Sequence, residues 1–241
     1  MTKLFKGPRN SITDIDDFLV GNAQDDNIKS GVTILTRSSS FRASVSILGG
    51  APGTKETDLL SPDKIVEKID GIVLAGGSAF GLDASSGVMD CLRSQNRGFD
   101  TGAIKVPIVP SAILFDLKNG GFKDWKINPY RELGRNAFLK ASDNFEIGSV
   151  GAGCGATTSV VKGGLGTSSI FSNNRIKVGA VVAVNSVGSP CFPGTNILYS
   201  DLYGQENANF KKPAIKSLIN ATKLLTGEAT TLGIVCTNVD F

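Results

Sequence analysis

Short apolar runs recur along the chain, and each is bounded by glycine, serine or asparagine. The runs are rich in valine and isoleucine, a composition that is typical of buried β-strands. We therefore predict five strands: Val32–Leu35, Ala43–Leu48, Ile72–Leu74, Val178–Val184 and Leu232–Cys236.

Three helices are predicted between these runs. The first is Ser61–Gly71, where a serine N-cap, a proline suited to the first helical position and an early acidic residue precede a glycine stop. The second is Ser78–Gln95, and the third is Lys212–Gly227. The buried face of the second helix is expected to consist of four residues: Phe80, Ala84, Val88 and Leu92.

Strands and helices alternate irregularly, and the helices suffice to cover sheet faces. This pattern is typical of a layered α/β or α+β domain. The stretch Leu117–Arg135 has no clear periodicity and is interpreted as a surface excursion. We find neither an internal repeat nor a convincing linker, so residues 1–241 are predicted to form a single domain.

The amino-acid composition excludes several kinds of catalytic and metal-binding site. The chain has no histidine, which excludes a Ser-His-Asp triad, a Cys-His pair and a histidine-ligated metal site. Any nucleophile needs activation by a lysine, a carboxylate or a free α-amino group. The formal net charge of +3 comes without a basic stripe, so nothing indicates nucleic-acid binding.

The cysteines and the N-terminal segment indicate the compartment. The four cysteines form no C-x-x-C pair and are interpreted as reduced thiols: Cys91, Cys154, Cys191 and Cys236. The segment Met1–Val20 lacks the apolar run of a signal peptide, and no stretch is long and apolar enough to span a membrane. We therefore expect a cytoplasmic protein with no membrane partner.

Glycine is enriched, with 29 residues, and two glycine-rich motifs stand out. Gly76–Gly81 lies at a strand-to-helix junction, where backbone N–H groups can hold an anion, but it lacks the lysine of a phosphate loop. Gly151–Gly155 misses the dinucleotide-binding pattern by one position. The alternative for both is a tight turn packed against neighbouring backbone. Cys154 is interpreted as a buried small residue rather than a nucleophile.

Two threonines, Thr230 and Thr231, lie between the predicted helix stop and the last strand. A threonine in such a place can attack the carbonyl of the preceding residue, shift the acyl group from N to O, and become a new N-terminus on hydrolysis. Its α-amine then acts as the base for its own hydroxyl, an activation open to a histidine-free protein. The alternative is an ordinary strand start, because threonine favours strands.

Seven motifs occur in order along the chain: Asn10–Asp14, Gly49–Asp58, Leu74–Ala84, Val106–Pro110, Gly148–Gly153, Lys162–Gly166 and Val178–Asn185. Together they resemble the self-processing DmpA-type aminopeptidase family. That family includes L-aminopeptidase/D-esterases, β-peptidyl aminopeptidases and the nylon-oligomer hydrolase. The resemblance runs from about Asn10 to Asn238, nearly the whole chain.

The resemblance implies an α+β fold, an αββα sandwich similar to N-terminal-nucleophile hydrolases. It also implies a precursor that cuts itself between Ala229 and Thr230, giving subunits of residues 1–229 and from residue 230 onward. Thr230 would be the nucleophile and its amine the general base. Asn185 resembles the asparagine whose amide forms part of the oxyanion hole. Lys162 resembles the active-site lysine of the nylon hydrolase.

The same resemblance suggests residues for substrate binding. Glu146 is the nearest match to the acid that holds the substrate's amino group. Ser78, Gly151 and Gly153 are expected to let the backbone approach the pocket. Structural alternatives stay open for the asparagine and the lysine named above, which are a turn cap and a solvated surface charge, respectively.

Two features depart from the family. Ala229 stands before the nucleophile, where asparagine is common. Family members also continue well past the nucleophile and supply acidic or hydroxyl helper groups there, whereas this chain ends at Phe241. We therefore expect a C-terminally truncated fold, which is a fragment, is completed by a partner chain, or is a decayed relative.

The implied activity is that of an aminopeptidase or amidohydrolase that acts on short peptides or amides through an acyl-Thr230 ester. It would need no metal or cofactor and would form a homo-oligomer of processed pairs. One rival is an inactive remnant or assembly subunit of the same family. A second rival is an acetyltransferase, because ornithine acetyltransferases share this architecture.

Overall fold

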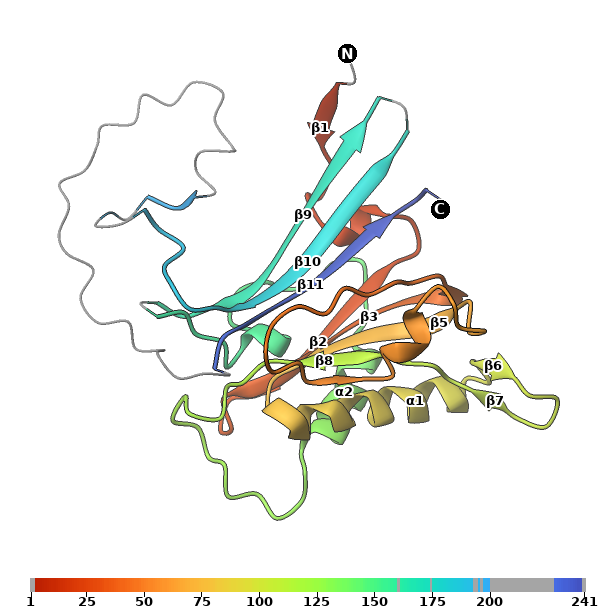
Figure 1. Ribbon diagram of the computed structural model, residues 1–241, viewed down its shortest axis with the longest axis horizontal. Helices are drawn as coiled ribbons and strands as arrows, with labels where there is room; N and C mark the ends of the chain where they lie inside the picture. Colours follow the sequence, from red (N-terminus) through yellow and green to blue (C-terminus); the bar gives the residue numbers. More distant parts are fainter. Residues whose placement is uncertain are drawn as a thin grey trace.

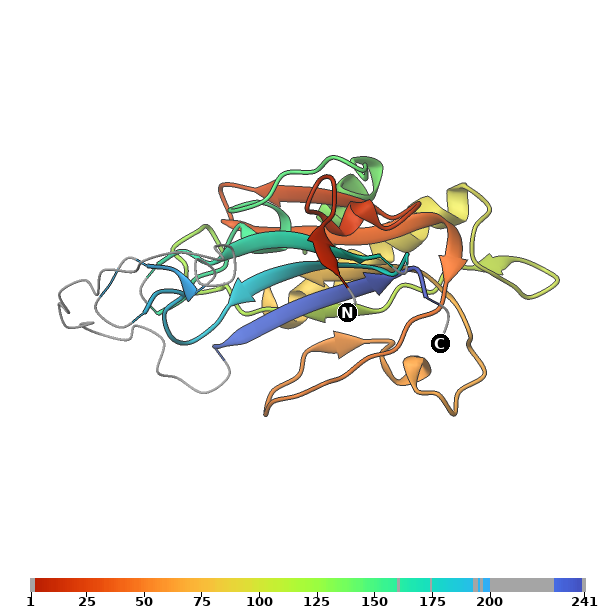
Figure 2. The ribbon, with the colours of Figure 1, turned by 90° about the horizontal axis from the view of Figure 1, so that it is seen from above.

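A computed structural model describes residues 3–159, 161–173, 175–192, 195, 197–199 and 228–239. In these residues two β-sheets lie face to face, and two α-helices cover the outer face of one of them (Figures 1 and 2). The arrangement is a layered α+β sandwich, as the sequence predicts. The predicted helix Lys212–Gly227 lies outside the described residues.

The five-stranded sheet has the order β2-β3-β5-β8-β4. Its pairs are antiparallel except for the parallel pair of β5 and β8, which the chain connects through a helix. A parallel pair requires such a crossover, because a tight turn cannot join parallel strands. The strands are β2 (Leu19–Asp25), β3 (Ser30–Phe41), β4 (Thr54–Lys55), β5 (Ile69–Ala75) and β8 (Ser111–Ile113).

The second sheet is antiparallel and has the order β1-β9-β10-β11. The chain enters it at the N-terminus and returns to it only after the first sheet is complete. Its strands are β1 (Leu4–Lys6), β9 (Gly164–Ser172), β10 (Lys177–Asn185) and β11 (Thr230–Thr237). The first and last segments of the described chain therefore share one layer (Figure 1).

The helices and short elements connect these strands. The two α-helices, α1 (Ala84–Ser94) and α2 (Tyr130–Leu139), pack against each other beneath the first sheet (Figure 1). A small hairpin of β6 (Phe99–Asp100) and β7 (Lys105–Val106) follows α1. The 3-10 helices are η1 (Ile12–Asp14), η2 (Asp58–Leu60), η3 (Ser78–Asp83) and η4 (Gly151–Gly153).

Strand β3 shows how the sequence produces two cores. Successive side chains of a strand point to opposite faces, so Leu35 joins the core between the sheets while Ile34 joins the core under the helices. Both side chains are fully buried. A strand buried on both faces reads as a continuous apolar run, which is why this run is visible in the sequence.

Four of the five predicted strands are confirmed, because each lies within β3, β5, β10 or β11. The strand predicted at Ala43–Leu48 is wrong. This segment forms no regular element and pairs with no strand, and Leu48 is 89% exposed. The pairing of β3 with β5 ends at Phe41 opposite Ile69, so the apolar run that follows Phe41 lies beyond the end of this ladder.

The helix predicted at Ser61–Gly71 is also wrong. Its capping signal yields only a turn after η2, and β5 begins at Ile69. Ile65, predicted to face the core, is 95% exposed. Pairing of the β-branched Ile69 with Phe41 outweighs a local helix signal, because helix propensity is a weak preference that tertiary contacts override.

The helix predicted at Ser78–Gln95 is confirmed in outline as η3 followed by α1. Three of its four predicted buried residues are fully buried, but Phe80 is 52% exposed and packs edge-on against Trp125. The surface excursion predicted over Leu117–Arg135 ends early, because α2 begins at Tyr130 and buries that side chain completely. No helix in the described part of the chain is long and apolar enough to cross a membrane.

Candidate functional site

The last residue of β10 and the first of β11 lie directly opposite each other. The ladder between the two strands ends with the pair Asn185 and Thr230. Opposed residues of an antiparallel pair have Cβ atoms about 4.5–5.5 Å apart. The structure therefore brings together the predicted nucleophile and the predicted oxyanion-hole donor.

The side chain of Asn185 connects three segments of the chain. It is fully buried, and its Nδ2 donates to the carbonyl oxygens of Phe115 at 3.0 Å and Glu228 at 3.1 Å. Its Oδ1 accepts from the backbone N–H of Thr157 at 3.0 Å. Both hydrogens of a side-chain amide are thus engaged by carbonyl oxygens. Asn185 is held rigidly, and it is more than a cap on its own turn.

The predicted cleavage site lies at the surface next to this buried amide. Ala229 is exposed and Thr230 is partly exposed. Glu228, the residue before Ala229, points its side chain toward the interior, and that side chain is only 13% exposed. The peptide bond between residues 229 and 230 therefore lies between the nearly buried side chain of Glu228 and the partly exposed first residue of β11.

Lys118 forms an ion pair with Glu228 and lies 5.9 Å above the ring of Phe115. Phe115 and Lys118 both lie on the loop after β8, and the sequence analysis interpreted the part from Leu117 onward only as a surface excursion. Lys118 and Glu228 are 110 positions apart. No periodicity signals an ion pair between such distant segments, so sequence analysis missed both residues.

A buried polar network lies beside Phe115. The carboxylate of Asp116, 3% exposed, accepts from Ser30 Oγ at 2.6 Å and from the backbone N–H of Gly77 at 2.7 Å. The hydroxyl of Tyr130 donates to Ser30 Oγ at 2.7 Å. The first glycine motif is therefore fixed by a carboxylate, and it is not an open anion-binding loop.

Burial governs the electrostatics of this network. Burial raises the pKa of Asp116, although the hydrogen bonds from Ser30 and Gly77 oppose the rise. Burial also raises the pKa of the Tyr130 hydroxyl, and the nearby charge of Asp116 adds to the effect. The phenol is therefore a hydrogen-bond donor throughout the physiological range.

Close packing explains glycine at two positions around the site. A Cβ on Gly155 would lie 2.2 Å from Asp116 Oδ2, and a Cβ on Gly163 would lie 1.9 Å from the carbonyl oxygen of Val184. Only a residue without a side chain allows these approaches. Ser78, within the first glycine motif, has a positive φ of 52°, and its N–H donates to the Leu114 carbonyl.

Lys162 lies on the loop that contacts Asn185. It pairs in an isolated bridge with Thr157, whose N–H binds the asparagine oxygen. Its side chain is exposed. Burial raises the pKa of the Cys154 thiol, while the charge of Lys162 opposes this rise. Cys154 is half-buried rather than buried as predicted, but a thiol with a raised pKa is a poor nucleophile, which argues against a catalytic role.

The other predicted binding residues lie on the segment between α2 and β9. Glu146 is exposed, its backbone carbonyl accepts from Asn22 Nδ2, and its carboxylate forms no ion pair within the described ranges. Gly151 and Gly153 are buried in η4 between the sheets. Their burial supports the alternative that this turn packs against neighbouring backbone.

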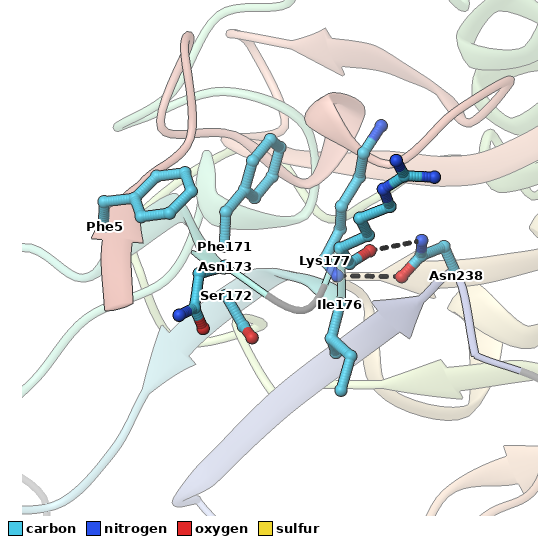
Figure 3. A pocket seen from close by; sticks show the side chains of 8 residues that line it. Phe5, Phe171, Ser172, Asn173, Ile176, Lys177 and Asn238 are labelled. Carbon is cyan, nitrogen blue, oxygen red and sulfur yellow. Dashed lines mark hydrogen bonds between the residues drawn. The ribbon is translucent and has the colours of Figure 1, made fainter. Parts of the chain in front are cut away.

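A hollow of about 450 Å³ lies at the opposite end of β9 and β10 from Asn185 (Figure 3). Phe5, Phe171 and Lys177 line it, and Asn238 bridges two backbone groups there. It contains none of the predicted site residues. Over the described residues, no group of three or more His, Cys, Asp or Glu side chains could hold a metal ion.

Comparison with solved structures defines the class of fold. An L-aminopeptidase D-Ala-esterase/amidase from Ochrobactrum anthropi, a variant of the N-terminal-nucleophile (Ntn) hydrolase fold, superposes with a TM-score of 0.62 at 21% identity. The match covers 78% of this chain and 56% of that structure. The sandwich is therefore an Ntn-hydrolase fold, as the sequence motifs predict.

Sequence comparison then gives the family. The model of peptidase family S58 matches residues 10–241, so the chain belongs to that family. An uncharacterised aminopeptidase of Mycobacterium bovis is 39% identical over 205 residues, covering 81% of this chain. A 6-aminohexanoate-oligomer endohydrolase of Paenarthrobacter ureafaciens is 28% identical over 177 residues, covering 70% of it. The chain spans 59% and 46% of the lengths of these two relatives.

Proposed function

We propose that the protein is an aminopeptidase or amidohydrolase that cleaves itself between Ala229 and Thr230 and then uses Thr230 as its nucleophile. The observation that carries the proposal is the pairing of Asn185 with Thr230 at the end of the ladder between β10 and β11. Membership of peptidase family S58 supports hydrolysis of peptide bonds.

The self-cleavage step balances without a cofactor. The Thr230 Oγ attacks the carbonyl carbon of Ala229, the C–N bond breaks, and the proton of the hydroxyl ends on the leaving amine. Water then hydrolyses the resulting ester and leaves a carboxylate on Ala229 and a free α-amine on Thr230. The new amine can serve as a base for the hydroxyl of the same residue.

Substrate hydrolysis repeats this chemistry on a second molecule. The α-amine of Thr230 accepts the proton of the Thr230 hydroxyl, and the Oγ attacks the substrate carbonyl carbon. The leaving amine takes the proton and departs, which leaves an acyl-threonine ester that water then hydrolyses. The amide of Asn185 stabilises the oxyanion, a contribution typically worth about 10²–10³ in rate. Lys162 adds positive charge beside the pocket. Glu146 binds the substrate's amino group.

The substrate class follows from the proposed chemistry. An attacking threonine and a carboxylate for an amino group fit the N-terminal residue of a short peptide or amide. Ser78, whose N–H donates to the Leu114 carbonyl, and the buried Gly151 and Gly153 would shape the backbone around the pocket rather than contact the substrate. We further propose that the processed pairs assemble into a homo-oligomer in the cytoplasm, which size-exclusion chromatography and fractionation test.

The test is the intact mass of the purified protein over time, compared with two variants. Thr230→Ala is expected to remain one polypeptide and to be inactive on aminoacyl anilides. Thr231→Ala is the matched control, because Thr231 is the exposed neighbour, and it should be cut as the wild type is. N-terminal sequencing of the new fragment should begin at Thr230.

Two outcomes would overturn the proposal. One is cleavage of the Thr230→Ala variant at the same bond. The other is a wild-type protein that stays at a single mass and hydrolyses no anilide, which would favour a non-catalytic member of the family.

A further inference from the structure

Glu228, two residues before the proposed nucleophile, is anchored at both its backbone and its side chain. Its carbonyl oxygen accepts from Asn185 Nδ2 at 3.1 Å, and its carboxylate pairs with Lys118. Among the ion pairs of the described residues, its carboxylate is the most buried: the side chain is 13% exposed, whereas the other acids in these pairs are 47% exposed or more.

One partner of Glu228, Lys118, comes from the loop after β8, and the other, Asn185 of β10, is bonded to that same loop. Lys118 lies over the ring of Phe115, and the carbonyl of Phe115 accepts from the same Asn185 amide at 3.0 Å. The loop is therefore linked to the segment before the cleavage site twice, directly through Lys118 and indirectly through Asn185. Two independent anchors fix both the position and the direction of the backbone that enters β11.

We propose that Lys118 and Glu228 are positioning residues for self-cleavage and, with Asn185, form a precursor clamp. The proposal rests on the proposed function. The clamp holds the chain just before the bond between residues 229 and 230, so that the carbonyl of Ala229 stays within reach of the Thr230 hydroxyl. Holding reacting groups in place is a large source of rate enhancement in intramolecular reactions.

The clamp also controls when the asparagine amide becomes available. In the uncut chain both Nδ2 hydrogens bind carbonyl oxygens, one of them from Glu228. A substrate oxyanion needs a donor that is not already occupied. After cleavage, Ala229 is no longer bonded to Thr230, so the Glu228 carbonyl can move away from Asn185. One N–H of the Asn185 side-chain amide then becomes available to a substrate. The uncut chain is therefore unable to bind a substrate oxyanion at Asn185.

The experiment measures how fast newly made precursor is cut, by denaturing gel and intact mass. Lys118→Met and Glu228→Gln are each expected to lengthen the half-life of the precursor about tenfold, because each removes a partly buried charge pair. The charge-reversed double variant, Lys118→Glu with Glu228→Lys, should recover most of the rate. Lys64→Met, which breaks an exposed pair with Asp63, is the matched control and should change nothing.

A second measurement does not depend on cleavage. In a Thr230→Ala background, Lys118→Met should raise amide hydrogen exchange across residues 228–232, and Lys64→Met should leave it unchanged. Unchanged exchange in the Lys118 variant would overturn the clamp whether or not the protein processes itself. Normal cleavage of Lys118→Met beside a normally cut wild type would overturn the clamp alone. A wild type that is never cut would overturn the proposed function and, with it, the role of the clamp in processing.

Discussion

The substitution Asp116→Asn tests whether burial or hydrogen bonding dominates the network under the glycine motif. The carboxylate accepts from Ser30 Oγ and from the Gly77 N–H. An asparagine can keep its oxygen toward Gly77, but its NH₂ must then face Ser30. The Ser30 oxygen can accept from both this NH₂ and the phenol of Tyr130, but the hydrogen of the serine hydroxyl then loses its acceptor.

The cost follows from that single loss. One buried donor without a partner costs about 1–3 kcal/mol of unfolding free energy. The loss is partly offset, because the variant no longer buries a charge. Asp116→Ala loses both hydrogen bonds and leaves a void, so it should be the more damaging substitution.

The direction in which stability changes with pH decides between burial and hydrogen bonding as the dominant effect on Asp116. Burial raises the pKa of Asp116 above its ordinary value of 3.8. A raised pKa means that the folded state binds the proton more tightly, so stability from this group is full below pH 3.8 and falls as pH rises through the folded pKa. Asparagine does not titrate, so it makes no pH-dependent contribution to stability. The stability difference, wild type minus Asp116→Asn, should therefore shrink as pH rises.

Urea unfolding of both proteins across a series of pH values measures this difference, and titrating groups common to both cancel. A difference that grows with pH would refute the reasoning. It would show that the two hydrogen bonds to the carboxylate outweigh its desolvation and hold the pKa below 3.8.

Two further predictions concern packing. Gly163→Ala should cost about 1–3 kcal/mol of unfolding free energy in a urea titration, because its Cβ would lie 1.9 Å from the Val184 carbonyl oxygen. Gly166→Ala is the control: a Cβ there meets open space, so the variant should change the unfolding free energy by less than about 0.5 kcal/mol. Leu35→Ala should cost about 2–5 kcal/mol by thermal and urea unfolding because Leu35 is fully buried, whereas the 89% exposed Leu48 should tolerate alanine; equal losses at the two leucines would contradict the assigned core.

Much of the fold could be predicted because buried strands leave a local signal. The apolar runs within β3, β5, β10 and β11 are each flanked by breaking residues, and all four are present. The strand ends at Asn185 and Thr230 were predictable separately. Their direct opposition was not, because register depends on contacts between the strands rather than on either sequence alone.

The failures have two physical causes: a local signal was outweighed by tertiary contacts, or no local signal existed. Ser61 begins a good helix-capping pattern, yet Ile69 gains more from pairing in β5. Helix α2 was hidden because it begins within a polar stretch, where Asn128 Oδ1 accepts from the N–H of Tyr130. The pair of Lys118 and Glu228 had no local signal at all, so only the folded chain shows it.

The ladder between β10 and β11 runs through eight residue pairs, from Asn185 opposite Thr230 to Val178 opposite Thr237. A break in the backbone just before Thr230 leaves every one of those pairs intact. The severed pieces would therefore remain associated in native buffer and separate only in denaturant. After such a break, recovery of the native state from denaturant becomes a bimolecular event, so its yield should depend on protein concentration, whereas refolding of the uncut monomer would not.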